Sequence, residues 1–141
     1  MTVKATAVRL LARREHSAYE LGQKLLLREF EADDIAQVIA ELKQGGWLSD
    51  ERFAAAYIRM RRLKGFGPVR IRRELQTRGV DETLVDTLLD GHSETWQQAL
   101  QQQYEKKCRH KRLVDFADKA KCIRFLQYRG FALDAIRKVM T

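Results

Sequence analysis

The sequence predicts an all-α protein made of three tandem three-helix repeats, and three observations carry this prediction. The 141 residues are rich in Leu, Ala, Arg, Lys, Glu and Gln, sparse in Val, Ile and Thr, and include one Pro. This composition favours helix over strand. Apolar residues recur at the spacing of one helical face along most of the chain. A short pattern of Leu, Arg, Gly and an apolar residue also returns at a nearly constant interval.

The recurring pattern divides the chain into three. It reads Leu-x-x-Arg-Gly-apolar in two copies and has Glu in place of Gly in another; the copies begin 50 and 51 residues apart, at Leu25, Leu75 and Leu126. We therefore expect helical repeats at 1–46, 47–91 and 92–141, the second being the most basic. One such repeat alone buries too little surface to be stable, so the repeats should pack end to end in an elongated, curved array.

The first repeat contains three predicted helices. The first covers about 3–15. Ser17 and Glu20 have the spacing of a capping box and begin the second helix, which runs to about residue 28. The third begins in the acidic cluster around Asp33 and ends at Gly45 and Gly46, because glycine commonly terminates helices.

The central repeat begins at Ser49 and Asp50, which can cap a helix. We expect Trp47 to anchor the core, and the buried face of this helix to consist of Phe53, Ala56, Tyr57 and Met60. Pro68 suits the first position of the next helix, which Gly79 ends. Asp81 caps the following helix, which ends at Gly91.

The last repeat should contain helices at 94–108, from about Asp115 to Gly130, and from 131 to the end. Trp96, Leu100 and Tyr104 recur every four residues in the first of these helices. With only two cysteines in the chain, no disulfide framework is predicted, which fits a reducing cytoplasm. Cys122 lies on an apolar helical face and is expected in the core.

No pattern in the chain is typical of an enzyme. The three histidines (His16, His92 and His110) have no Ser or Cys partner in a triad-like arrangement. Cys108, His110 and Cys122 are too few for a usual zinc site, and the glycines near Phe66 lack the rest of a phosphate-binding loop. We therefore predict no catalytic residue, no metal and no cofactor. No apolar run approaches the ~20 residues that span a membrane.

Basic charge dominates the central repeat. The chain has 27 Lys and Arg against 19 Asp and Glu, a net charge of +8, and Glu74 is the one acidic residue between Arg59 and Arg78. The pairs Arg59/Arg62 and Arg70/Arg73 are spaced three apart, so each pair should share a helical face. Such a surface can follow a nucleic-acid backbone or bind an acidic protein groove, and a solvated face without a partner is the third reading.

The sequence resembles the RecX family, which regulates the bacterial recombinase RecA. The resemblance covers most of the chain and is sharpest in GWLSDERFA at 46–54 and KGFGPVRIRRELQTRGV at 64–80, with YRGF at 128–131 matching the third repeat. Glu29 departs from the pattern, because the other two repeats have Gly there. The first repeat is the loosest match.

The resemblance implies an elongated helical regulator without catalytic activity. Such a protein binds RecA and the groove of the RecA–DNA filament as a cytoplasmic monomer. It restrains RecA's ATPase, strand-exchange and coprotease activities in DNA repair, recombination and the SOS response. The alternative is a direct, sequence-nonspecific DNA-binding module. The expected contacts are the basic residues of the central repeat and a secondary patch in the third: Arg59, Arg61, Arg62, Lys64, Arg70, Arg72, Arg73, Lys106, Lys107, Arg109, Lys111 and Arg112.

Overall fold

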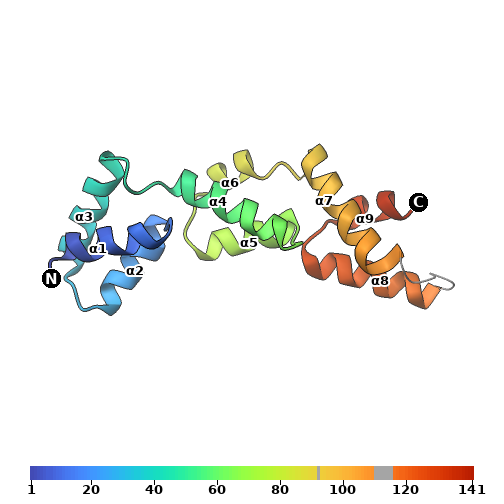
Figure 1. The fold of residues 1–141 in the computed structure, drawn as a ribbon, viewed down its shortest axis with the longest axis horizontal. Helices are drawn as coiled ribbons and strands as arrows, with labels where there is room; N and C mark the ends of the chain where they lie inside the picture. The colour runs from blue at the N-terminus through green and yellow to red at the C-terminus, as the bar shows by residue number, and fades with distance from the viewer. Residues whose placement is uncertain (92, 110–115) are drawn as a thin grey trace. The chain divides into compact units, whose positions relative to one another are not determined.

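The structure is all-α. It is a computed structural model that describes residues 1–91, 93–109 and 116–141. Within these ranges it contains nine α-helices and one π-helical turn but no strand (Figure 1). The predicted fold class is therefore confirmed, while the curvature of the array stays a prediction.

The helices follow the predicted order closely. The first three are α1 (Val3–Arg13), α2 (Ala18–Leu27) and α3 (Ala32–Gln44), and the next three are α4 (Asp50–Leu63), α5 (Pro68–Thr77) and α6 (Glu82–Leu88). Then come α7 (Glu94–Tyr104), the π-helical turn η1 (Glu105–Arg109), α8 (Phe116–Arg129) and α9 (Leu133–Met140). The helix starts predicted at Asp50 and Pro68 are confirmed, and Asp115 lies outside the described residues.

The chain divides into two compact units. The first unit is Met1–Tyr57 with Leu75–Val85, and the second unit is Ile58–Glu74 with Asp86–Thr141. Helices α4, α5 and α6 each contribute residues to both units. Each unit is thus more than one three-helix repeat, as expected if a single repeat cannot bury enough surface alone.

The core of the first unit forms where α1, α2 and α3 pack against one another (Figure 1). Ala7, Leu21 and Leu25 are fully buried there, and the same cluster contains Leu10, Ile35, Val38, Leu42 and Leu48. The capping box at α2 is confirmed: Ser17 Oγ accepts from the Glu20 backbone N–H, and the Ser17 N–H donates to the Glu20 carboxylate.

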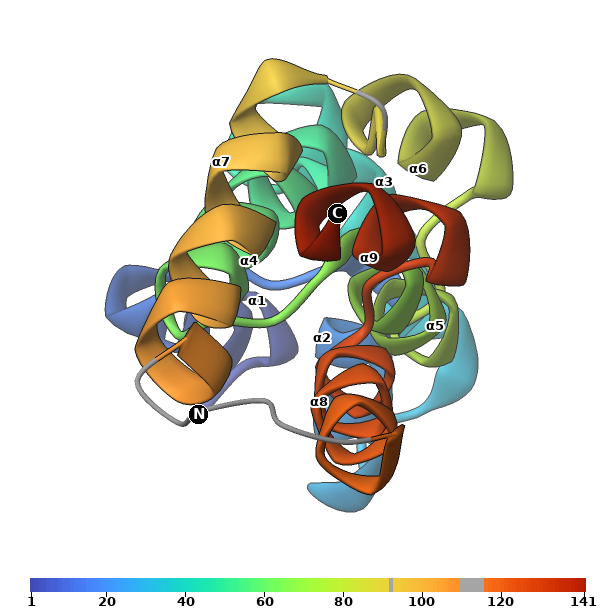
Figure 2. The same ribbon diagram turned by 90° about the vertical axis from the view of Figure 1, so that its right-hand side faces the viewer.

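In the second unit, α9 packs against both α7 and α8 (Figure 2). Trp96, Leu100, Leu126 and Ile136 are buried in this unit. The apolar spacing predicted for the helix at 94–108 is therefore confirmed at Trp96 and Leu100, whereas Tyr104 is half-buried.

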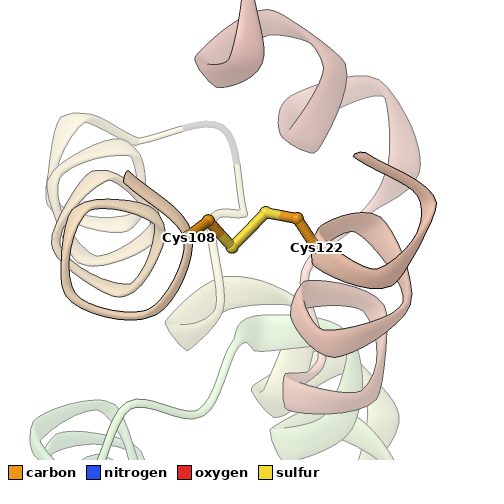
Figure 3. Close-up of a disulfide and its surroundings, with 2 residues drawn as sticks. All are labelled: Cys108 and Cys122. Carbon is orange, nitrogen blue, oxygen red and sulfur yellow. A yellow bond between two sulfur atoms is a disulfide. The ribbon is translucent and has the colours of Figure 1, made fainter. Parts of the chain in front are cut away.

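The two cysteines form a disulfide, so the prediction of no disulfide is wrong. Cys108 in η1 and Cys122 in α8 are joined, with their Cα atoms 5.8 Å apart (Figure 3). Both side chains are buried, as predicted for Cys122. Cysteine counting missed the pair because two residues 14 positions apart carry no spacing motif, and only the packing of η1 on α8 brings them together.

The recurring sequence pattern is one helix ending used three times. In each copy the N–H of the apolar residue donates to the carbonyl of the Leu five positions earlier, at 3.1–3.4 Å. The residue before it has a left-handed backbone: φ is 65° at Glu29, 74° at Gly79 and 106° at Gly130. The predicted role of the two glycines as helix terminators is confirmed.

Two of these endings also dock on another helix start. In the first unit, Ser17 Oγ donates to the Arg78 carbonyl at 2.7 Å, and a Cβ on Gly79 would overlap the Cβ of Tyr19. In the second unit, the N–H groups of Gly67 and Val69 donate to the carbonyls of Arg129 and Gly130 at 2.7 and 2.9 Å. The open C-terminal carbonyls of one helix thus bind groups at the open N-terminus of another.

Glu29 has the left-handed position at the end of α2, and no described group at another helix start hydrogen-bonds to this ending. Its side chain is exposed while its φ is 65°, a conformation that costs a non-glycine residue about 1 kcal/mol. We expect Glu29→Gly to raise the free energy of unfolding of the first unit by about 1 kcal/mol. Urea unfolding followed by circular dichroism would measure it. Glu29→Ala keeps the Cβ and removes the charge, so an equal gain in that variant would contradict the backbone explanation.

The buried face of α4 differs from the predicted one. The structure buries Phe53, Ala54 and Ile58, whereas Met60 is 40% exposed. Trp47 is 63% exposed, so its predicted role as a core anchor is wrong. The predicted face shares Phe53 with the buried one, but the helix is rotated so that the side with Ala54 and Ile58 faces inward.

His16 is a buried polar residue of the first unit, with 1% of its surface exposed. Its Nδ1 lies 3.0 Å from the Arg14 carbonyl oxygen, and its Nε2 lies 2.8 Å from the Lys24 ammonium. Because a carbonyl only accepts, Nδ1 carries the proton and Nε2 accepts from Lys24. Burial lowers the pKa of His16, and the charges of Arg14 and Lys24 act in the same direction.

Acid should therefore destabilise the first unit. The unfolded chain takes up a proton on His16 near pH 6.5 and the folded chain only at lower pH, so stability is full above pH 6.5 and falls below it. We expect a loss of about 1 kcal/mol between pH 7.5 and 5.5. Urea unfolding at both pH values would measure it, and His16→Gln should remove this part of the dependence. An unchanged dependence in that variant would contradict the assignment.

Candidate functional site

The two units differ in their balance of basic and acidic residues. The second unit contains 18 Lys and Arg against 8 Asp and Glu, whereas the first contains 9 against 11. The excess positive charge of the chain therefore belongs entirely to the second unit. A surplus of this size in about half of a small protein is typical of a surface that binds a polyanion.

Some of the predicted contact residues are available for a partner. Arg59, Lys64 and Arg73 are exposed, and none has an acidic partner among the residues that the structure describes. Lys106 and Lys107 are exposed in η1. Lys111 and Arg112 lie outside the described residues, as does the side chain of Arg109.

Arg61 and Arg70 instead share one carboxylate. Arg61 donates to Glu74 through Nε and Nη2 at 2.9 and 2.8 Å, and Arg70 donates to it through Nε at 3.2 Å. Arg70 Nη1 also donates to the Tyr128 carbonyl at 3.2 Å. Hydrogen bonding at Tyr128 and Glu74 raises the pKa of Arg70, so this guanidinium stays charged. Glu74 thus fixes α4 to α5, and Arg70 fixes α5 to α8.

Three guanidinium groups surround Phe66. Those of Arg61, Arg70 and Arg129 lie 3.9, 4.5 and 4.8 Å from the ring centroid. Arg129 also donates to the Lys64 carbonyl at 3.2 Å. Guanidinium groups stack well on aromatic faces, so this cluster holds the α4–α5 turn on α8.

The remaining two predicted arginines also make contacts within the second unit. Arg62 lies 5.6 Å from the ring centroid of Trp96. Arg72 forms an ion pair with Asp86. Arg62 and Arg70, both expected as contacts with a partner, thus each lie against an aromatic ring of the second unit.

A groove lies between α5 and α8. Its volume is 390 Å³. Tyr128, which is 71% exposed, lies in its wall, with the Arg70 guanidinium 5.0 Å from the ring centroid. The lining residues are Val69, Arg70, Arg73, Glu74, Gln127, Tyr128 and Gly130.

Sequence reasoning missed Phe66, Tyr128 and Arg129 as partners of the basic residues. Phe66 lies between two glycines just before a predicted helix start, and the other two residues lie about sixty positions further along the chain. The sequence signal that could have indicated these internal contacts was Glu74, a single acidic residue among many arginines. Such a residue is more often a shared ion-pair partner than a solvated side chain.

The described residues contain neither a candidate metal site nor a candidate membrane span. Among them, no group of three or more His, Cys, Asp and Glu side chains is placed to hold a metal ion. None of their helices is both long and apolar enough to cross a membrane.

The fold and the site define a class of protein: an all-α array of three-helix domains with a strongly basic part. The chain matches the family models for the first, second and third three-helix domains of RecX, at residues 4–42, 49–89 and 94–140. It therefore belongs to the RecX family of regulatory proteins.

Individual relatives agree. The chain is 39% identical to "Regulatory protein RecX" of Legionella pneumophila (strain Corby) over 95% of its own length and 89% of the relative's. It is also 36% identical to "Regulatory protein RecX" of Pseudomonas fluorescens, over 100% of its own length and 91% of that relative's. The crystal structure of RecX from Lactobacillus salivarius has the same fold, with a TM-score of 0.87 at 20% identity over 98% of this chain and 92% of that one.

Proposed function

We propose that this protein binds RecA and the RecA–DNA filament in the cytoplasm and restrains RecA's ATPase, strand-exchange and coprotease activities. It acts as a monomer and not as an enzyme. The observation that carries the proposal is the charge of the second unit, 18 basic against 8 acidic residues, in a member of the RecX family. A filament of protein and DNA is a polyanion of the kind that such a surface binds.

The exposed cations are the proposed contacts. Some of the basic residues have no ion pair with another described residue and can therefore neutralise phosphates or carboxylates: Arg59, Lys64, Arg73, Lys106 and Lys107. Arg61, Arg70 and Arg72 instead form ion pairs within the second unit. Charge reversal should therefore be restricted to the first group. In a variant of Arg61 or Arg70, weaker binding could not be distinguished from a loss of folded structure.

The test is RecA-catalysed ATP hydrolysis on single-stranded DNA with substoichiometric additions of this protein. We expect inhibition, and we expect the Arg59→Glu/Arg73→Glu variant to need about ten-fold more protein for the same effect. Arg9→Glu/Arg13→Glu makes the same charge change at exposed residues of α1 in the first unit and should leave inhibition nearly unchanged. No inhibition at any ratio would refute the proposal.

A direct, sequence-nonspecific DNA-binding module is the second candidate, and the same charge surplus favours it. Titration into DNA with and without RecA at two salt concentrations separates the two. Tight binding without RecA would favour the second candidate, and weak, salt-sensitive binding is compatible with the first.

A further inference from the structure

The groove between α5 and α8 combines three features that suit a ligand with both a ring and a negative charge. It has an aromatic ring in its wall, a cation without an acidic partner among the described residues, and an apolar side chain that is 46% exposed, Val69. We propose that this groove binds single-stranded nucleic acid, with a base stacked on Tyr128 and the adjoining phosphate on Arg73. The proposal rests on the proposed function for its biological context and adds a site to it.

Tyr128 is a preformed stacking platform. The helix around it is anchored, since Leu126, two positions earlier, is fully buried and Arg129 packs on Phe66 and Phe125. The Tyr128 ring remains 71% exposed. Arg70 lies near this ring and is itself held by Glu74 and by the Tyr128 carbonyl. A base can therefore stack without the ordering cost that a mobile aromatic would carry.

Arg73 supplies the charge. It lines the same groove one helical turn after Arg70, is exposed, and has no acidic partner among the described residues. The carboxylate in the groove, Glu74, already accepts from Arg61 and Arg70 and so does not neutralise Arg73. A guanidinium in this state is a suitable donor for a phosphate oxygen.

The unit around the groove favours a nucleic acid over an acidic peptide. One or two carboxylates would satisfy the groove itself, but the whole second unit has ten more basic than acidic residues. A chain of phosphates can engage that charge beyond the groove. The ring favours a single strand, because the bases of a duplex are stacked on each other and present no free face. The volume of 390 Å³ falls within the range of about 300–1,000 Å³ typical of small-ligand sites, enough for one nucleotide unit.

The test is fluorescence anisotropy of a labelled oligothymidylate of about 12 nucleotides, without RecA. We expect salt-dependent binding, with Tyr128→Ala and Arg73→Ala each raising Kd about ten-fold. Tyr128→Phe should bind like the parent protein, because stacking needs the ring and not the hydroxyl. Circular dichroism and the fluorescence of buried Trp96 verify that each variant is folded.

Two matched controls lie on α8 outside the groove. Phe116→Ala removes an exposed ring, and Arg124→Ala removes an exposed guanidinium; each should change Kd by about two-fold at most. The inference is overturned if Tyr128→Ala binds the oligonucleotide like the parent protein. It is also overturned if a duplex binds with the same sensitivity to that change, or if oligoglutamate binds in place of the oligonucleotide.

The same variants in the RecA ATPase assay separate this inference from the proposed function. Inhibition of RecA by a parent protein that does not bind the oligonucleotide would refute the groove and retain the regulator. Oligonucleotide binding through Tyr128 without any effect on RecA would retain the groove and refute the regulator.

Discussion

Replacing Gly130 with alanine is expected to lower the free energy of unfolding of the second unit by about 3 kcal/mol. Gly130 ends α8 with φ at 106°, which an L side chain rarely adopts. A Cβ there would lie 2.8 Å from the Arg70 backbone nitrogen and 3.0 Å from the Gly67 carbonyl oxygen, and closer still to the Arg70 Cβ. The atoms in the way belong mainly to the backbone of α5 and its turn, so they cannot move aside cheaply.

The contact at Gly130 also holds the two helices in register. The Gly130 carbonyl accepts the Val69 N–H at 2.9 Å, and the Arg129 carbonyl accepts the Gly67 N–H at 2.7 Å. Moving α8 away to make room for a methyl group would break both hydrogen bonds and leave the donors near the start of α5 unpaired. Backbone strain and lost pairing therefore act together in this variant.

Urea unfolding followed by Trp96 fluorescence would measure the effect in a Trp47→Phe background. Trp96 is 4% exposed in the second unit and reports on its core, whereas Trp47 is largely exposed. Gly91→Ala is the matched control, because the contact that a Cβ there would make among the described residues is with Pro68, at an ordinary 3.5 Å. We expect that control to cost less than about 1 kcal/mol. Equal stability of the two variants would contradict the docking of α8 on α5.

The repeat could be predicted from the sequence because each helix ending is determined by residues that are close together in the chain. A helix ending needs Leu, a left-handed residue and an apolar residue at fixed spacing, and these were visible at Leu75, Gly79 and Val80. The docking of that ending on Ser17 could not be predicted. It depends on which helix start lies opposite, and the partners are 61 residues apart.

The same distinction applies to the candidate site. The basic character of the segment around Arg59 and Arg73 follows from composition, and both residues are exposed. Composition does not indicate which arginines form contacts within the protein and which are available for a partner. Arg61 is one position from Arg62 and two from Arg59, yet it is tied to Glu74 because the turn at Phe66 brings α5 back along α4. Helical spacing gives the face of a residue, but the packing of the next helix decides its partner.

Reducing the Cys108–Cys122 disulfide is expected to lower the free energy of unfolding of the second unit by about 3 kcal/mol. The bond closes a loop of 15 residues and restricts the unfolded chain, and a loop of that length gives about this value in the chain-entropy treatment. In the folded protein it joins η1 to α8, and both sulfur-bearing side chains are buried (Figure 3). In the chain-entropy treatment, most of the effect should arise in the unfolded state.

Urea unfolding with and without dithiothreitol, followed by Trp96 fluorescence, would measure this difference. The Cys108→Ser/Cys122→Ser variant should unfold at the same urea concentration in both conditions and should match the reduced protein. Thiol titration of the oxidised protein under denaturing conditions should find no free thiol among its two cysteines. Two free thiols together with no response to reductant would show that the bond does not form.

The size of this effect matters for the proposed function because RecA filaments would be met in a reducing compartment, where protein disulfides are seldom stable. A loss of about 3 kcal/mol is a large part of the 5–15 kcal/mol that typically stabilises a small protein. The second unit, which bears the excess basic charge, would then be less stable in its reduced form. Its remaining stability would rest on the arginine cluster around Phe66 and on the docking at Gly130. The Gly130→Ala variant should therefore be much more sensitive to reductant than the parent protein, and unfolding it with and without dithiothreitol tests this directly.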